Sequence, residues 1–201
     1  AILDKLNITS APMAMRIETE IQADIQGFKN SNLEGKIELV NSSIEHNKKK
    51  LYIPEFLIES RKNQGWRSFH IYSDIVEVNA IGDFSLETIY GHFSSFMYEH
   101  QLALQNNDSI ITRHYQSKNR FYKESPHFSV DYRFLFKDIN PLVNLFIDDF
   151  FISNRTSLEG RFSKNKQVAF SATTYFDTLN IKGNQFKGLE FNKEVLKFFN
   201  V

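Results

Sequence analysis

The stretch IETEIQADIQG, residues 17–27, decides the fold class of this chain. Ile17, Ile21, Ala23 and Ile25 fall on one parity of this stretch, and charged or amide side chains occupy every position of the other parity. Successive side chains of a β-strand point to opposite faces, so this period of two indicates a strand with one apolar and one wet face. Such a strand needs a sheet beside it.

The same alternation continues outward from this stretch. Residues 33–39 repeat it after the turn-forming residues 29–32, so we predict a hairpin. Pro54 lies inside the next apolar run, which predicts a bulge or a position where one N–H is not needed. Strands are expected at 51–60, 66–73, 74–84, 128–136, 149–153, 158–163 and 168–176, with shorter ones within 179–191.

Helical periodicity appears in two places. Apolar residues recur every three or four positions from Leu86 to Met97, which predicts an amphipathic helix near residues 85–104 with Ser85 as its N-cap. Asn140-Pro141 opens a short helical turn that reaches Ile147. Residues 105–125 are polar and irregular, so we expect a mobile loop there with at most a short strand at 110–115.

Composition sets limits on the partners and the chemistry. The 24 basic residues balance the 24 acidic ones in a chain of 201 residues, so no general attraction to nucleic acid is expected. The run Lys48-Lys49-Lys50 is interpreted as a solvated hairpin tip. There is no cysteine, which excludes disulfides and thiolate chemistry. No stretch is apolar enough for a spanning helix, and a start at Ala1 suggests one β-rich segment, residues 1–201, of a longer chain.

Catalytic signatures are absent from the sequence. The six histidines show no zinc-binding spacing, and there is no nucleophile elbow, phosphate-binding glycine loop or dinucleotide fingerprint. Asp148 and Asp149 form the nearest approach to a carboxylate pair, but neighbours in a strand point to opposite faces. We therefore expect no enzymatic activity, no metal and no cofactor.

Phenylalanine is the feature that stands out, with 20 residues that lie largely on strand faces already rich in Ile and Val. Burial of each such side chain contributes about 1.5–3 kcal/mol, so these faces need a cover. A second sheet, the helices or a bound apolar ligand could each supply it, and most apolar strand faces simply form cores. Residues 86–104 form the only long candidate helix, so strand surface exceeds the available cover.

Two segments of the sequence are similar to each other, and both resemble a known protein family. SNLEGK at 31–36 is similar to TSLEGR at 156–161, a weak sign of a repetitive β architecture. LEGKIELVNSSIEH with KKKLYIPEFLIES, within residues 33–60, and FISNRTSLEGRF, within 140–167, resemble the TamB branch of the AsmA-like proteins. The resemblance extends over most of residues 17–192 and includes no catalytic or ligand-binding motif.

The resemblance implies an elongated, curved antiparallel sheet, a β-taco with an apolar groove, in the bacterial periplasm. Its members are thought to carry phospholipid between the inner and outer membranes, with an inner-membrane anchor that would lie outside this chain, and some assist an outer-membrane barrel protein of the assembly type. The runner-up interpretation is a structural or adaptor β module that assists outer-membrane protein assembly. The match places ten residues in the lipid groove: Ile21, Ile25, Ile37, Val76, Val78, Phe84, Phe128, Val130, Phe134 and Phe170.

Overall fold

The computed structural model describes residues 15–27, 34–105, 127–165 and 168–197, which form a ten-stranded antiparallel sheet with two helices. The expected all-β class with minor helix is confirmed. The predicted loop at 105–125 and the short strand at 110–115 fall almost entirely outside the described residues. The elements are β1 (Met15–Gln26), β2 (Glu34–His46), β3 (Lys49–Asn63), β4 (Trp66–Ser73), β5 (Val76–Asp83), α1 (Leu86–Gln105), β6 (Phe128–Phe136), α3 (Asn140–Val143), β7 (Phe150–Ile152), β8 (Thr156–Lys164), β9 (Val168–Ile181) and β10 (Asn184–Lys197).

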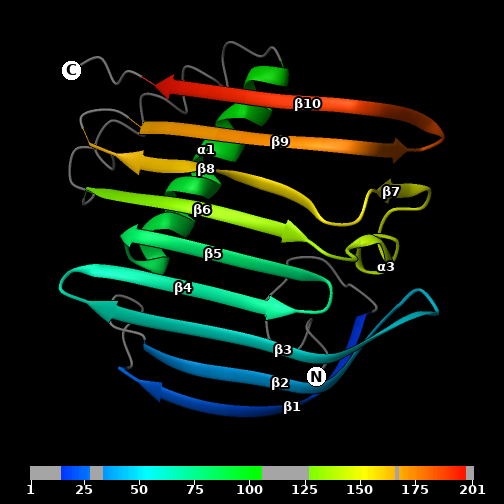
Figure 1. The fold of residues 1–201 in the computed structure, drawn as a ribbon, viewed down its shortest axis with the longest axis horizontal. Coiled ribbons are helices and arrows are strands. Elements are labelled where there is room, and N and C mark those ends of the chain that lie inside the picture. The colour runs from blue at the N-terminus through cyan, green and yellow to red at the C-terminus, as the bar shows by residue number, and fades with distance from the viewer. Residues whose placement is uncertain (1–14, 28–33, 106–126, 166–167, 198–201) are drawn as a thin grey trace.

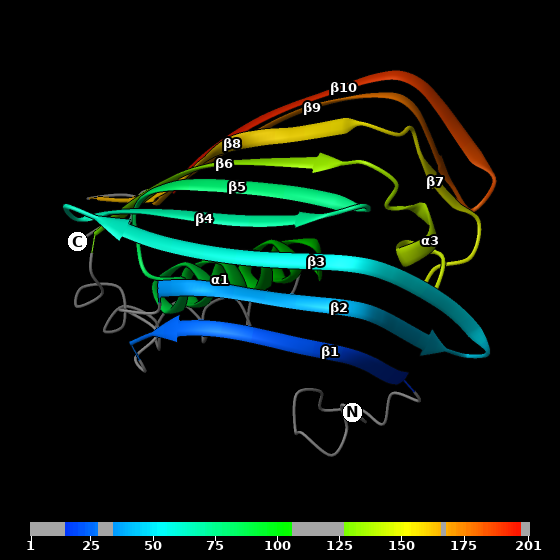
Figure 2. The same cartoon turned by 60° about the horizontal axis from the view of Figure 1, so that its bottom comes forward.

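The strands lie in the order β1-β2-β3-β4-β5-β6-β8-β9-β10, and β7 pairs with β9 off this path (Figure 1). Neighbours in space are therefore mostly neighbours in sequence, as in a meander. The sheet is curved and does not close, so β1 and β10 form its two edges (Figure 2). The hairpin expected from residues 17–39 is the β1–β2 pair at one of these edges.

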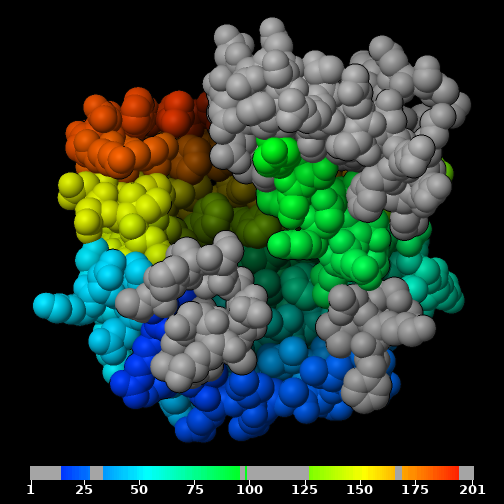
Figure 3. All heavy atoms as spheres, turned by 180° about the vertical axis from the view of Figure 1, so that it is seen from behind, coloured from blue at the N-terminus to red at the C-terminus, as the bar shows by residue number. Residues whose placement is uncertain are grey.

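Helix α1 begins where the sequence predicts it. The Ser85 side chain accepts a hydrogen bond from the backbone N–H of Thr88 at 3.1 Å, which caps the helix. Leu86 and Ile89 of α1 pack against the buried cluster of Phe84, Phe128, Val130 and Phe162. We call the sheet face that α1 covers the inner face, and the opposite one the outer face. Figure 3 shows α1 lying across the inner face between the two edges of the sheet.

A β-bulge bends the sheet near one end of the β1–β2 pair. The register shifts between Glu18 and Glu20, and Asn41 of β2 takes a positive φ of 53°. On the other side of β2, the pairing with β3 passes over Asn41 and Pro54. Pro54 therefore occupies a position where its missing N–H costs nothing, as the sequence predicts.

The β9–β10 hairpin differs from the prediction. Residues 179–191 do not form shorter strands, because β9 runs without a break to Ile181 and β10 continues to Lys197. Lys182 and Gly183 have φ values of 50° and 81°, so they make a two-residue hairpin turn in the middle of the segment. The Asn180 side chain accepts a hydrogen bond from the Gly183 N–H at 3.1 Å. A tight turn, rather than a change of strand, explains the apparent interruption.

The two Leu-Glu-Gly sequences place glycines in similar surroundings. A Cβ atom added at Gly35 would lie 2.0 Å from the carbonyl oxygen of Asp24, and one at Gly160 would lie 1.9 Å from that of Ser171. Both oxygens belong to the neighbouring strand, so each glycine allows two strands to approach closely. The similarity of the two sequences therefore corresponds to one structural requirement, a residue without a Cβ atom where two strands approach closely.

Candidate functional site

The strand register joins single residues into rows that cross the sheet from edge to edge. One such row lies on the inner face and is apolar at every position except Thr174. We call it the inner apolar row. It consists of Ala23, Ile37, Ile58, Ile71, Val78, Phe134, Leu158, Thr174 and Phe191.

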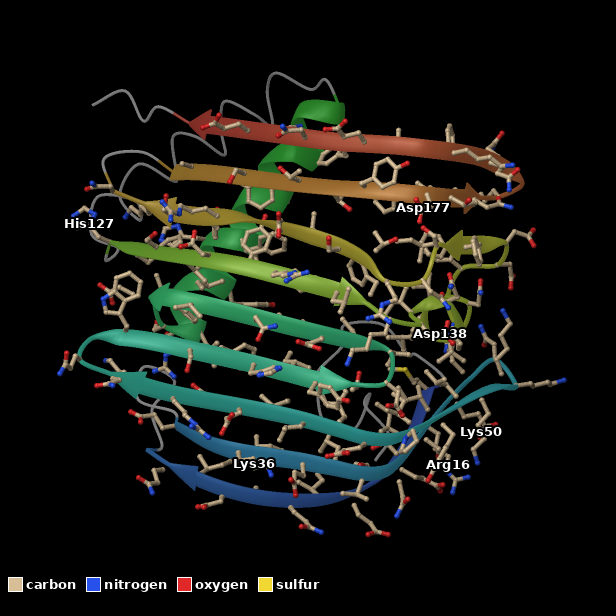
Figure 4. All side chains as sticks on the ribbon, in the orientation of Figure 1. Arg16, Lys36, Lys50, His127, Asp138 and Asp177 are labelled. Atoms are coloured by element: carbon tan, nitrogen blue, oxygen red, sulfur yellow. The ribbon has the colours of Figure 1, made fainter. Side chains whose placement is uncertain are left out.

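The next residue along each strand belongs to a row on the outer face, and this row contains only polar or charged side chains. We call it the outer polar row. It consists of Asp24, Lys36, Glu59, His70, Asn79, Arg133, Glu159, Thr173 and Asn192. Adjacent residues point to opposite faces, so each strand of the path presents an apolar side chain inward and a polar one outward. Figure 4 shows the side chains on this sheet.

Helix α1 closes one part of the inner face. Phe84, Phe128, Val130 and Phe162 are 3–7% exposed and form the buried cluster beneath it. The rings of Phe128 and Phe162 meet edge to face, with their centroids 5.0 Å apart. This part of the face is an ordinary protein core.

A second part of the inner face remains uncovered by described residues. Figure 3 shows a hollow between α1 and the segment around α3, with the central strands as its floor. Ile58, Ile71, Phe134 and Leu158 of the inner apolar row are only half-buried, although each has neighbouring strands on both sides. Phe134 stacks on Phe136, with a centroid distance of 6.3 Å. The floor of the hollow is thus built from large apolar side chains that still meet solvent.

The edges of the inner face are more open still. Ile21 and Ile25 of β1 are 64% and 42% exposed, and Leu189 and Phe191 of β10 are 37% and 43% exposed. The outer surface of α1 adds Tyr90, which is 76% exposed. Apolar side chains of this size are therefore accessible on both sides of α1, and an exposed apolar face of this extent is typical of a binding surface.

All ten residues predicted from the resemblance lie on the inner face or directly beside it, as the register and the packing around α1 place them. Their surroundings differ. Val78, Phe84, Phe128 and Val130 are buried, whereas Ile21 and Ile25 are exposed and the other four are half-buried. The prediction did not include the other apolar members of the inner apolar row, which are Ala23, Ile58, Ile71, Leu158 and Phe191. The alternation of β1, β8 and β10 carries a signal for Ala23, Leu158 and Phe191, whereas β3 is apolar on both parities and gives none for Ile58. Only the register joins these residues into one row.

Three polar side chains, those of Arg67, Tyr132 and Lys164, also lie on the inner face. Arg67 is 1% exposed and donates hydrogen bonds to the Ser60 hydroxyl at 2.6 Å and the Phe84 carbonyl at 3.3 Å. Burial lowers the pKa of Lys164 and raises the pKa of Tyr132 to about 12. The Tyr132 hydroxyl donates to the Ser171 carbonyl at 2.7 Å. The Arg67 and Tyr132 side chains thus hydrogen-bond to the protein itself, which is how buried polar side chains are normally stabilised.

The hairpin tip after β2 is exposed at Lys48, Lys49 and Lys50, as the sequence interpretation expects, and Lys49 also contacts a segment distant in sequence. Lys49 donates hydrogen bonds to the Asn144 carbonyl at 2.6 Å and to the carboxylate of Asp148, in the turn after α3. This ion pair lowers the pKa of Asp148. Asp148 and Asp149 lie in a turn and not in a strand, and Asp149 has a φ of 57°. The tip therefore docks on the α3 segment because a cation and a carboxylate distant in sequence meet there.

The described residues contain no group of three or more His, Cys, Asp or Glu side chains that could hold a metal ion. Within the same part of the chain, no helix is long and apolar enough to cross a membrane. No family model, curated protein or solved structure matches this chain.

Proposed function

We propose that the inner face carries phospholipid acyl chains, and that the chain is a segment of a lipid-transport bridge between the inner and outer membranes. The inner apolar row is the observation that supports this proposal most strongly. It presents an apolar side chain on almost every strand from β1 to β10, so its chemistry does not change across the sheet. An acyl chain requires a continuous apolar surface and no fixed polar contact, since it has nothing to hydrogen-bond.

The open hollow between α1 and the α3 segment supports the same proposal. A protein core buries its large side chains, yet Ile58, Phe134 and Leu158 remain half-exposed in the interior of a sheet. Acyl chains laid on this floor would remove that apolar surface from water, at about 25 cal/mol for each Å². Head groups would remain in water at the open side, so transfer needs no covalent step.

The wider assignment rests on the resemblance of residues 33–60 and 140–167 to the TamB branch. It places the segment in the periplasm, tethered through a region outside this chain, with an outer-membrane barrel protein as a partner. In the alternative, an adaptor module for outer-membrane protein assembly, the same apolar face would dock a protein.

The direct test is mass spectrometry of a gentle solvent extract from the purified chain. We expect phospholipid at a defined ratio to protein. Leu158→Arg places a charge on the floor of the hollow and should reduce the bound lipid at least tenfold. Glu159→Arg is the control, because it introduces the same side chain at the neighbouring position on the outer face. Equal lipid content in both variants, with circular dichroism showing both folded, would contradict the proposal.

A further inference from the structure

The two edges of the sheet differ in how they are protected against pairing with another strand. Exposed edges usually carry a proline, an inward-pointing charge, a bulge or a very short strand. In β10, Lys193 occupies an inner-face position opposite Ala172. This edge therefore carries an inward-pointing charge, which is one of the usual protective features.

Strand β1 carries none of these features between Glu20 and Gln26. This stretch contains no proline, pairs with β2 without interruption, and turns only Ile21, Ala23 and Ile25 toward the inner face. All of its residues are exposed. In the described part of the chain, residues 20–26 pair with β2 alone, so their backbone N–H and C=O groups that point away from β2 have no strand partner there.

The order of side chains along β1 is self-complementary. If two copies of β1 lie antiparallel with Ala23 on the two-fold axis, Ile21 of each copy faces Ile25 of the other. On the outer face, Gln22 then faces Asp24, and Glu20 faces Gln26. Each carboxylate thus meets an amide that can donate a hydrogen bond, and no like charges are opposed.

In the neighbouring registers, carboxylates of the two copies face each other. A two-fold axis at Ile21 places Glu18 of one copy opposite Asp24 of the other, and an axis at Gln22 places Glu20 opposite Asp24. An axis at Asp24 places the two Asp24 side chains opposite each other. Like charges directly opposite each other destabilise a strand pair. Of the four registers centred on residues 21–24, only the one at Ala23 joins apolar to apolar and carboxylate to amide.

We propose that β1 is a self-association edge, at which two copies of this chain pair antiparallel about a two-fold axis at Ala23. Main-chain hydrogen bonds supply the attraction, and the side chains fix the register. The symmetry is of the isologous kind that closes a dimer. The two inner faces then lie side by side, so the apolar surface continues from one copy into the other. This inference does not depend on the nature of any ligand.

Single-cysteine variants test the pairing, because the natural sequence contains no cysteine. Opposed residues of antiparallel strands have Cα atoms about 4.5–5.5 Å apart, within the range of about 4.4–6.8 Å that a disulfide spans. Mild oxidation should therefore convert Ala23→Cys to a covalent dimer. Phe191→Cys is the matched control, since it lies in the same row at the other edge and is also exposed. Ile21→Cys and Ile25→Cys should cross-link efficiently only when the two variants are mixed.

Charge variants at Gln22 supply a second readout in equilibrium sedimentation of the whole chain. Gln22→Lys faces Asp24 of the other copy and should lower the dimer dissociation constant about three- to tenfold, while Gln22→Glu should raise it by a similar factor. A monomer at all concentrations, or cross-linking of Ala23→Cys no faster than that of Phe191→Cys, would overturn the proposal. Lipid content of the same samples is measured separately, so loss of dimerisation and loss of lipid binding are distinguished.

Discussion

Two regions of one sheet face, made of the same kinds of residue, have opposite surroundings. Beneath α1, Val130 and Phe162 are each 3% exposed, whereas Ile21 on β1 is 64% exposed. All three point to the same side of the sheet. The comparison shows that alternation along a strand determines which face a side chain joins, while the position of one helix determines whether that side chain forms core or surface.

Stability measurements should separate the two regions most clearly. Phe162→Ala removes a ring from the cluster under α1 and should lower the free energy of unfolding by about 3–5 kcal/mol. Ile21→Ala, on the same face, should change it by about 0.5 kcal/mol or less in the monomer, at protein concentrations below the dimer dissociation constant. Urea denaturation at such concentrations, followed by circular dichroism, measures both. Similar losses in the two variants would mean that Ile21 is covered within the monomer.

Glycine substitutions provide the next largest contrast. Gly160→Ala would bring a Cβ atom within 1.9 Å of the Ser171 carbonyl oxygen and 2.8 Å of the Tyr132 hydroxyl, so we expect a loss of about 1–3 kcal/mol. Gly91→Ala on α1 meets no atom within 4 Å and should stabilise the protein by up to about 1 kcal/mol. Thermal unfolding should move the two midpoints in opposite directions. A rise for Gly160→Ala would show that β8 and β9 are further apart than described.

The sequence predicts which residues lie on the inner face better than it predicts which of them helix α1 covers. Alternation placed Ile37, Val78 and Phe134 on one face because the period of a strand is a local property. Which of them α1 covers depends on how a helix at residues 86–105 crosses strands from distant parts of the chain, and no local pattern contains that information. The complete row emerges only from the register, which the bulge at Asn41 shifts within the β1–β2 pair.

The Tyr132 hydroxyl tests the boundary between the closed and open regions. Burial raises its pKa to about 12, above the ordinary value of about 10. The folded state therefore holds this proton more tightly, and the resulting stability is present below pH 10 and lost as the pH rises toward 12. Tyr132→Phe removes the hydrogen bond to Ser171 and should cost about 1 kcal/mol near neutral pH. Its stability should also fall less steeply between pH 10 and 12, and an unchanged slope would show that another group titrates.

The outer face should give the smallest effect. Arg161 donates hydrogen bonds to Asp131 at 2.6 and 2.9 Å, which lowers the pKa of the Asp131 carboxyl group. The stability that this ion pair contributes is present above the unfolded pKa of about 3.9, and it is lost as the pH falls through the lower pKa of the folded state. Because both side chains are more than half exposed, Asp131→Asn should cost at most about 1 kcal/mol at pH 7 and less at pH 2. Chemical denaturation at the two pH values checks this, and a large loss at pH 7 would mean that the outer face is buried against another surface.

The claim that lipid covers the open part of the inner face is tested most directly by photo-crosslinking in cells. A benzophenone amino acid at Phe134 fits the floor of the hollow, and the same group at Arg133 projects from the adjacent position of the outer face. The account predicts that light captures phospholipid at position 134 and not at position 133. Capture of protein alone at position 134, or of lipid equally at both positions, would contradict it.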